Sequence, residues 1–93
     1  MGKLIILRGN SGSGKTTTAK ELQNRFGHNT MLISQDAVRR EMLKVRDGEN
    51  TLALPLMKEL LRYGSEHSDV VILEGIMYSD WYKPLFELAV QLY

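Results

Sequence analysis

Short runs of consecutive apolar residues alternate along the chain with longer stretches in which apolar residues recur every three or four positions. The runs lie within residues 3–8, 31–34 and 70–75, and a continuous apolar run is typical of a strand buried on both faces of a parallel sheet. Each run is followed by a stretch with the periodicity of an amphipathic helix. The order β-α-β-α-α-β-α predicts parallel strands joined by right-handed crossovers, in a three-layer α-β-α fold.

Glycine and turn-forming residues mark the expected ends of the first two helices. The first helix is predicted to begin at Lys15 and to end before Gly27, which takes the C′ position. Its apolar face consists of Ala19, Leu22 and Phe26. A second helical stretch begins at Gln35 and Asp36 and ends at the turn formers of residues 47–50. Its expected apolar face consists of Val38, Met42 and Val45.

The last two helices are predicted from N-cap residues and apolar faces. The third is expected to begin after Thr51 as its N-cap and to end at Gly64. Its apolar face consists of Leu56, Met57, Leu60 and Leu61. The fourth is expected to be capped by Asp80. Its apolar face consists of Leu85, Leu88, Ala89 and Leu92.

Composition indicates one small globular domain that spans residues 1–93. The formal net charge is only +1, so the protein lacks the strong overall positive charge that is typical of nucleic-acid-binding proteins. Any basic binding site must therefore be local. The chain has no cysteine, which excludes disulfides and thiolate metal sites and is typical of cytosolic proteins. Its apolar runs are far shorter than the roughly 20 residues that cross a bilayer. We therefore expect a soluble, cytoplasmic protein without a membrane partner.

The number of strands is small for this architecture. Three strands are expected, whereas sheets usually contain about 4–6. The sequence also stops at Tyr93, on the apolar face of the last predicted helix. We therefore expect an N-terminal fragment that lacks the last strands of its domain.

A phosphate-binding pattern joins the first strand to the first helix. Residues Gly9-Asn10-Ser11-Gly12-Ser13-Gly14-Lys15-Thr16 match the Walker A pattern G-x-x-x-x-G-K-[ST]. The glycines let backbone N–H groups converge on phosphate oxygens, and the helix N-terminus adds partial positive charge. Lys15 is predicted to reach the β and γ phosphates, Thr16 to bind Mg²⁺, and Thr17 to contact phosphate. The alternative is a turn that only connects a strand to a helix.

A second pair of chemically active residues follows the second strand. Asp36 lies at the carboxyl edge of the sheet, where α/β proteins bind ligands. A carboxylate there can accept the proton of a substrate hydroxyl during phosphoryl transfer. Arg39, one helical turn later, is expected to face the same cleft and to hold a substrate anion. Asp36 can also be the N-cap of its helix, and the two roles can coexist.

The Walker A pattern, the D-x-x-R pair of Asp36 and Arg39, and a strand ending in Glu74-Gly75 together resemble the N-terminal half of certain P-loop kinases. This group contains zeta toxins, polynucleotide 5′-kinases and chloramphenicol phosphotransferases, and the resemblance covers essentially all 93 residues. It implies an adenylate-kinase-like core, ATP with Mg²⁺, and a lid that these residues do not include. It also implies that Asp36 activates the acceptor hydroxyl, that Arg39 binds the substrate, and that residues 9–16 hold ATP.

Several side chains at the same edge admit two interpretations. Glu74 stands where a Walker B carboxylate lies and can contact a Mg²⁺-bound water or the substrate, or it can accept hydrogen bonds from loop N–H groups. A group of cations can attract a phosphorylated acceptor or form a solvated helix face; these are Arg40, Lys44 and Arg46. A cluster after the third strand can line an acceptor site or pack into the core; it contains Met77, Tyr78, Trp81 and Tyr82.

The pattern favours a kinase that uses ATP and Mg²⁺ to phosphorylate an alcohol. In this hypothesis Lys15 and Asp36 are catalytic, and Asp36, Arg39 and Glu74 bind the substrate. The acceptor can be a nucleoside, a nucleotide sugar, an antibiotic or a polynucleotide 5′ end. Two other functions remain open, namely a nucleotide-binding module without catalysis and a regulatory ATPase without an acceptor.

Overall fold

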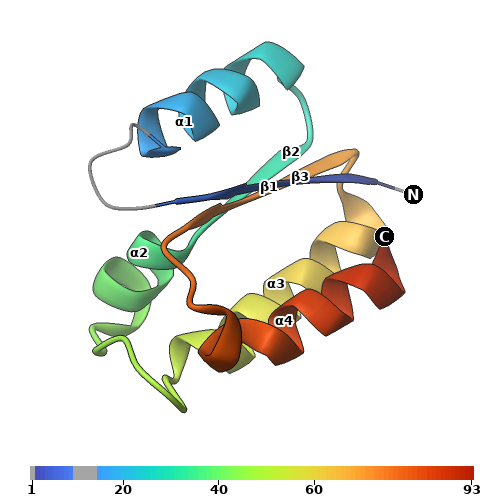
Figure 1. Ribbon diagram of the computed structural model, residues 1–93. Helices are drawn as coiled ribbons and strands as arrows, with labels where there is room; N and C mark the ends of the chain where they lie inside the picture. Colours follow the sequence, from blue (N-terminus) through green and yellow to red (C-terminus); the bar gives the residue numbers. More distant parts are fainter. Residues whose placement is uncertain (1, 10–14) are drawn as a thin grey trace.

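The protein folds as a parallel sheet between two helical layers, as its apolar pattern predicts. The computed structural model describes residues 2–9 and 15–93, and of Lys15 and Thr16 it describes the backbone only. One helix covers one face of the sheet, two helices cover the other, and a short helical segment lies at the carboxyl ends of the strands (Figure 1). In chain order the elements are β1 (Lys3–Arg8), α1 (Lys15–Phe26), β2 (Thr30–Ser34), α2 (Gln35–Ala37), the π-helix η1 (Val38–Leu43), α3 (Ala53–His67), β3 (Val70–Gly75) and α4 (Ser79–Leu92).

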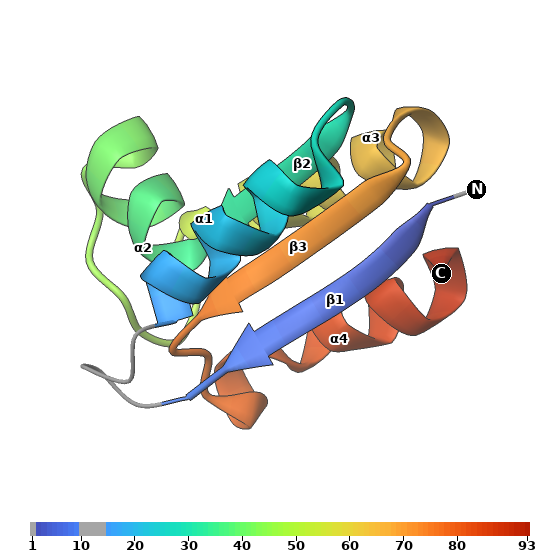
Figure 2. The same cartoon turned by 90° about the horizontal axis from the view of Figure 1, so that it is seen from above.

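The sheet places β3 in the centre. Its strand order is β1-β3-β2, and both outer strands run parallel to β3. Viewed from above, α1 lies over β2 and the adjoining side of β3, and β1 lies beside β3 on the side away from α1 (Figure 2). All six residues of β3 are buried, as expected for a central strand. The expectation of burial on both faces is wrong for β1, where Ile6 is 39% exposed, because this strand has a hydrogen-bonded neighbour on one side only.

The larger core lies between the sheet and the pair α3 and α4. Met57 and Leu61 of α3 and Leu85 of α4 are completely buried there against Val71 and Leu73 of β3. A smaller core on the other face joins Ala19 of α1 to Val70 and Ile72. The predicted apolar faces of these three helices therefore supply most of the core, but the prediction is wrong for Phe26, which is 46% exposed at the end of α1.

Helix ends follow the sequence signals less closely. Gly27 does end α1, with a φ of +76° that favours glycine. Gly64 does not end α3: the helix continues to His67, and Gly64 is buried where a side chain would meet Val71 and Met31. Its small size therefore serves packing.

The predicted N-caps of α3 and α4 are each displaced. Leu52 occupies the N-cap of α3, and the hydroxyl of Thr51 accepts a hydrogen bond from the N–H of Ala53 at 3.3 Å. Tyr78 occupies the N-cap of α4, so that Asp80 lies inside the first turn. Asp80 is still well placed, because a negative charge near a helix N-terminus interacts favourably with the helix dipole.

The second helical stretch differs most from the prediction. It is a single α-turn followed by the π-helix η1, which ends at Lys44 in the left-handed conformation with φ of 55°. A π-helix places i→i+5 partners together, so residues spaced for an α-helix no longer share one face. Val38 is buried accordingly, whereas Met42 is 58% exposed.

Candidate functional site

The carboxyl ends of the strands bring the predicted site segments to one edge of the sheet. Arg8 at the end of β1 is in register with Gly75, and Ser34 at the end of β2 is in register with Glu74. Helix α1 begins at this same edge with the backbone of Lys15 (Figure 1). The fold therefore supports the strand-to-helix context that the Walker A pattern requires.

The predicted phosphate-binding residues are described only at their flanks. Gly9 and Thr17 are exposed on either side of the loop. The predictions for the side chains of Lys15 and Thr16 lie outside the described part of the molecule, as do those for Asn10, Ser11, Gly12, Ser13 and Gly14. Their roles stay predictions from the sequence.

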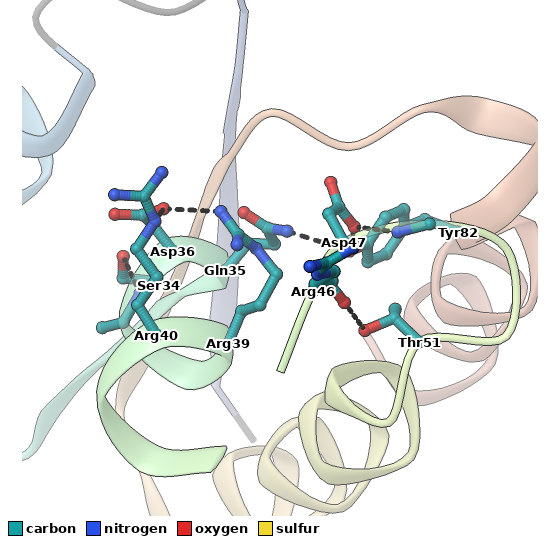
Figure 3. Close-up of polar contacts among 11 residues, drawn as sticks. Ser34, Gln35, Asp36, Arg39, Arg40, Arg46, Asp47, Thr51 and Tyr82 are labelled. Atoms are coloured by element: carbon teal, nitrogen blue, oxygen red, sulfur yellow. Dashed lines mark hydrogen bonds and ion pairs between the residues drawn. The ribbon is translucent and has the colours of Figure 1, made fainter. Parts of the chain in front are cut away.

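Asp36 forms ion pairs with two arginines. Its Oδ1 lies 2.9 Å from Nη2 of Arg39 and 2.9 Å from Nε of Arg40 (Figure 3). The hydroxyl of Ser34, not Asp36, caps the helix by accepting the N–H of Ala37 at 3.3 Å. The N-cap interpretation of Asp36 is therefore wrong, and its carboxylate, 56% exposed, is available for other contacts.

The two arginines differ in burial. The side chain of Arg40 is 67% exposed, as in a solvated helix face, whereas that of Arg39 is only 17% exposed. The Nε of Arg39 is buried and has no hydrogen-bond partner among the described residues. Because a buried charged donor is costly to leave unpaired, Arg39 is the arginine suited to bind an added anion.

Glu74 lies one strand away from Asp36 and is 2% exposed. Side chains alternate along a strand, so Glu74 shares the face of Ile72, which packs against α1. Glu74 and Asp36 line the same cavity, of about 450 Å³. The fold thus brings these two predicted carboxylates together at the carboxyl edge of the sheet, where α1 begins.

The sequence did not predict a chain of hydrogen bonds between buried and partly buried side chains next to Arg39. The amide of Gln35 donates to the hydroxyl of Tyr82 at 2.9 Å, and that hydroxyl donates to Oδ1 of Asp47 at 2.6 Å. Figure 3 shows Arg39 between Asp36 on one side and the pair of Tyr82 and Asp47 on the other. These two hydrogen bonds connect α4 and the loop after η1 to Gln35, the residue that precedes Asp36.

The aromatic cluster after β3 is mostly core. Tyr82 is completely buried and Met77 is 4% exposed, so neither forms an open acceptor wall. Tyr78 is 59% exposed and meets Trp81 edge to face at 4.8 Å. Tyr82 stands three positions before Leu85 and seven before Ala89, a helical spacing that could have assigned it to the core.

Arg8 is a further residue that sequence patterns did not single out. Its guanidinium donates to the carbonyl of Met77 at 2.7 Å and to the hydroxyl of Ser79 at 3.0 Å. It also lies 4.5 Å from the ring centre of Phe86. Arg8 thereby fastens the segment between β3 and α4 to the strand that enters the phosphate-binding loop.

Replacing Tyr82 with phenylalanine should lower the free energy of unfolding by about 1–3 kcal/mol, because Gln35 and Asp47 lose a buried hydrogen-bond partner. Chemical denaturation measures this loss. Tyr78→Phe is the matched control, since the exposed Tyr78 should change stability by less than about 0.5 kcal/mol. Equal stabilities of the two variants would contradict the importance of the buried chain.

Alkaline pH should weaken the hydrogen bonds of Tyr82 and lower the free energy of unfolding. Burial and then the hydrogen bond to Asp47 raise the pKa of Tyr82 from 10.0 to about 12. A raised pKa in the folded state adds stability that is complete below pH 10 and is lost as pH rises toward 12. Burial also raises the pKa of Tyr93, so Tyr82→Phe should flatten the alkaline fall in unfolding free energy only in part. An unchanged pH profile in this variant would contradict the prediction.

The described residues contain neither a helix long and apolar enough to cross a bilayer nor a group of three or more histidine, cysteine or acidic side chains that could hold a metal.

Comparisons with known proteins agree with this fold. The sequence profile of the family described as AAA domain matches residues 4–92. The crystal structure of the protein APE1195 superposes with a TM-score of 0.65 at 18% sequence identity and covers 98% of the chain. The chain in turn spans 57% of the length of that structure. Among curated protein sequences, none matches the chain significantly.

Proposed function

Because the chain belongs to the AAA-domain family, whose profile spans residues 4–92, and has a P-loop fold, we propose that it is the nucleotide-binding core of an ATP-dependent kinase with an alcohol as acceptor. The observation that carries the proposal is the cavity lined by Asp36 and Glu74 at the edge where the Walker A sequence meets α1. An exposed carboxylate in such a cavity can accept the proton of an acceptor hydroxyl, as transfer to an alcohol requires. The D-x-x-R pair favours the zeta-toxin, polynucleotide-kinase and chloramphenicol-phosphotransferase group.

In this proposal residues 9–17 bind ATP, with Lys15 on the β and γ phosphates. The hydroxyl of Thr16 is a suitable ligand for Mg²⁺, and the buried carboxylate of Glu74 supplies oxygen acceptors of the kind that Mg²⁺ and its waters prefer. When bound, Mg²⁺ would offset negative charge on the phosphates. The absence of cysteine favours a cytoplasmic location.

Asp36 is proposed to accept the proton of the acceptor hydroxyl as the oxygen attacks the γ-phosphorus. One carboxylate oxygen, Oδ1, is held by Arg39 and Arg40, which leaves Oδ2 for the acceptor. Arg39 would then stabilise negative charge on the transferred group or on the substrate through its partly buried guanidinium.

The test is a transfer assay. The protein, with any further segments of its natural chain, is incubated with labelled ATP and Mg²⁺ and with a panel of nucleosides, sugars, antibiotics and 5′-hydroxyl oligonucleotides. Acceptor-dependent ADP release with a phosphorylated product is expected. ATP hydrolysis that no member of the panel stimulates would favour a regulatory ATPase instead.

Lys15→Ala should weaken ATP binding by about 10- to 100-fold, since a charge-assisted phosphate contact is worth about 1.5–3 kcal/mol. Isothermal titration calorimetry measures the affinity. Lys83→Ala on α4 removes an exposed lysine outside both the Walker A pattern and the cavity of Asp36 and serves as the control. Equal affinities of the two variants for ATP would refute the proposed phosphate loop.

A further inference from the structure

Arg8 contacts residues that lie before and after Tyr82 in the sequence. Its guanidinium donates to the carbonyl of Met77 at 2.7 Å and to the hydroxyl of Ser79 at 3.0 Å, and it lies 4.5 Å from the ring centre of Phe86. Ser79 lies three residues before Tyr82 and Phe86 four residues after it, so the three side chains occupy one side of α4. Arg8 therefore holds the turns of α4 that flank Tyr82.

The first turn of α4 connects these contacts to the proposed base. The N–H of Tyr82 donates to the carbonyl of Tyr78 at 2.9 Å, and Tyr78 lies between the two residues that accept hydrogen bonds from Arg8. The hydroxyl of Tyr82 accepts a hydrogen bond from the amide of Gln35 at 2.9 Å (Figure 3). Gln35 is 3% exposed and directly precedes Asp36. A displacement of this turn would therefore reach Gln35 through one hydrogen bond.

The backbone of Arg8 stands at the start of the phosphate-binding loop. Arg8 is the last residue of β1, is in register with Gly75 of β3, and is followed by Gly9, the first residue of the Walker A pattern. Its backbone thus belongs to the strand that leads into the loop, whereas its side chain binds the helix that contacts Gln35. The separation of these two parts matters for phosphoryl transfer, because the reacting atoms must lie about 3–3.5 Å apart.

We propose that Arg8 is a positioning residue that acts through α4 and Tyr82 to hold Gln35, and with it Asp36, at a fixed place relative to the phosphate-binding loop. The inference rests on the proposed kinase function and adds to it a residue that acts through other side chains. A guanidinium suits this role because its planar fork binds two acceptors at once and stacks on an aromatic ring, whereas a lysine ammonium is a point charge.

The first measurement follows Gln35 by NMR of isotope-labelled glutamine side-chain amides, with the Gln35 signal assigned through Gln35→Met. Arg8→Met keeps an apolar stem but removes the guanidinium donors. We expect it to move the Gln35 signal, as Tyr82→Phe does by removing the hydrogen-bond acceptor of that amide. Arg25→Met is the matched control, because Arg25 is exposed in the last turn of α1. An unmoved Gln35 signal in Arg8→Met would overturn the inference.

The second measurement is the kinetics of phosphoryl transfer to an acceptor found in the panel assay. Arg8→Met should lower kcat by about 10- to 100-fold, because a misplacement of about 1 Å can cost up to about 100-fold in rate, and should change the Kd for ATP by less than about threefold. Arg8→Lys should recover part of kcat, since an ammonium can still bind one of the two acceptors. Equal changes in kcat and in the Kd for ATP would show that Arg8 serves the phosphate-binding loop alone and would overturn its role toward Asp36.

A double variant tests whether Arg8 acts through Tyr82. If it does, Arg8→Met combined with Tyr82→Phe should lower kcat little more than Tyr82→Phe alone, because the contact that Arg8 supports is already lost. Gln35→Met replaces Tyr82→Phe in this comparison at temperatures where the latter unfolds, since it removes the other partner of the same hydrogen bond. Losses of kcat that multiply in the double variant would contradict the proposed route.

The two proposals fail in different ways. Transfer to no acceptor, with the Gln35 signal displaced in Arg8→Met, would remove the kinase function while the link from Arg8 to Gln35 persists. Transfer by the unaltered protein, with an unmoved Gln35 signal and an unchanged kcat in Arg8→Met, would leave the kinase function standing and remove the positioning role of Arg8.

Discussion

Replacing Asp36 with asparagine is expected to lower the rate of phosphoryl transfer by about 10²- to 10⁴-fold, the usual contribution of a general base. Asparagine keeps an oxygen that can accept hydrogen bonds from Arg39 and Arg40, which both bind Oδ1 of Asp36 at 2.9 Å. The substitution therefore removes the proton acceptor with little change in shape. ATP affinity should stay nearly constant, because in the proposal residues 9–17 hold ATP and Asp36 contacts the acceptor hydroxyl.

The chain offers a matched control for this experiment. Glu59 and Arg62 form an ion pair at 3.7 Å with a spacing of three residues on α3, where both side chains are at least half exposed. Glu59→Gln thus neutralises a paired carboxylate away from the proposed site and should leave kcat unchanged. Full transfer activity in Asp36→Asn would show that another group takes the proton, and Asp36 would lose its catalytic role.

The closeness of Arg39 to Asp36 could be predicted because it depends on local geometry, whereas their ion pair was not part of the prediction. Residues three apart on a helical turn are neighbours whatever the rest of the fold does. The buried strand β3 was equally predictable, because a continuous apolar run has few other stable environments in a small protein. Local spacing and local composition therefore located the sheet edge and, among the described residues, Asp36, Arg39 and Glu74.

Local spacing and composition could not predict the hydrogen bonds that link Gln35, Tyr82 and Asp47. Tyr82 lies 47 residues from Gln35 and 35 residues from Asp47, so these contacts depend on the packing of α4 against the sheet. The π-helix escaped prediction for a related reason. Its i→i+5 pairing has no distinctive residue pattern, and Val38 and Met42 fit an α-helix equally well in the sequence. Where the local pattern allowed more than one structure, contacts between residues far apart in the sequence determined which one formed.

Gly75 connects the central strand to the position of the proposed base. It has a φ of +145°, and a Cβ built on it would lie 2.6 Å from Cβ of Gln35, the residue before Asp36. Gly75→Ala should therefore cost about 1–3 kcal/mol of unfolding free energy for backbone strain and about 1–3 kcal/mol more for the forced contact. It should also slow phosphoryl transfer, since relief of the contact must move Gln35 and with it Asp36.

Gly48→Ala separates these two effects. Gly48 has a φ of +146°, but a Cβ added to it would have no atom within 4 Å, so its substitution should carry the backbone strain without the contact. Denaturant titrations of both variants give the two losses in stability, and the difference between them measures the contact with Gln35. Equal losses of unfolding free energy in the two variants would show that Gln35 moves away from the added methyl group at no cost. Normal phosphoryl transfer in Gly75→Ala would then show that β3 does not fix the position of Asp36.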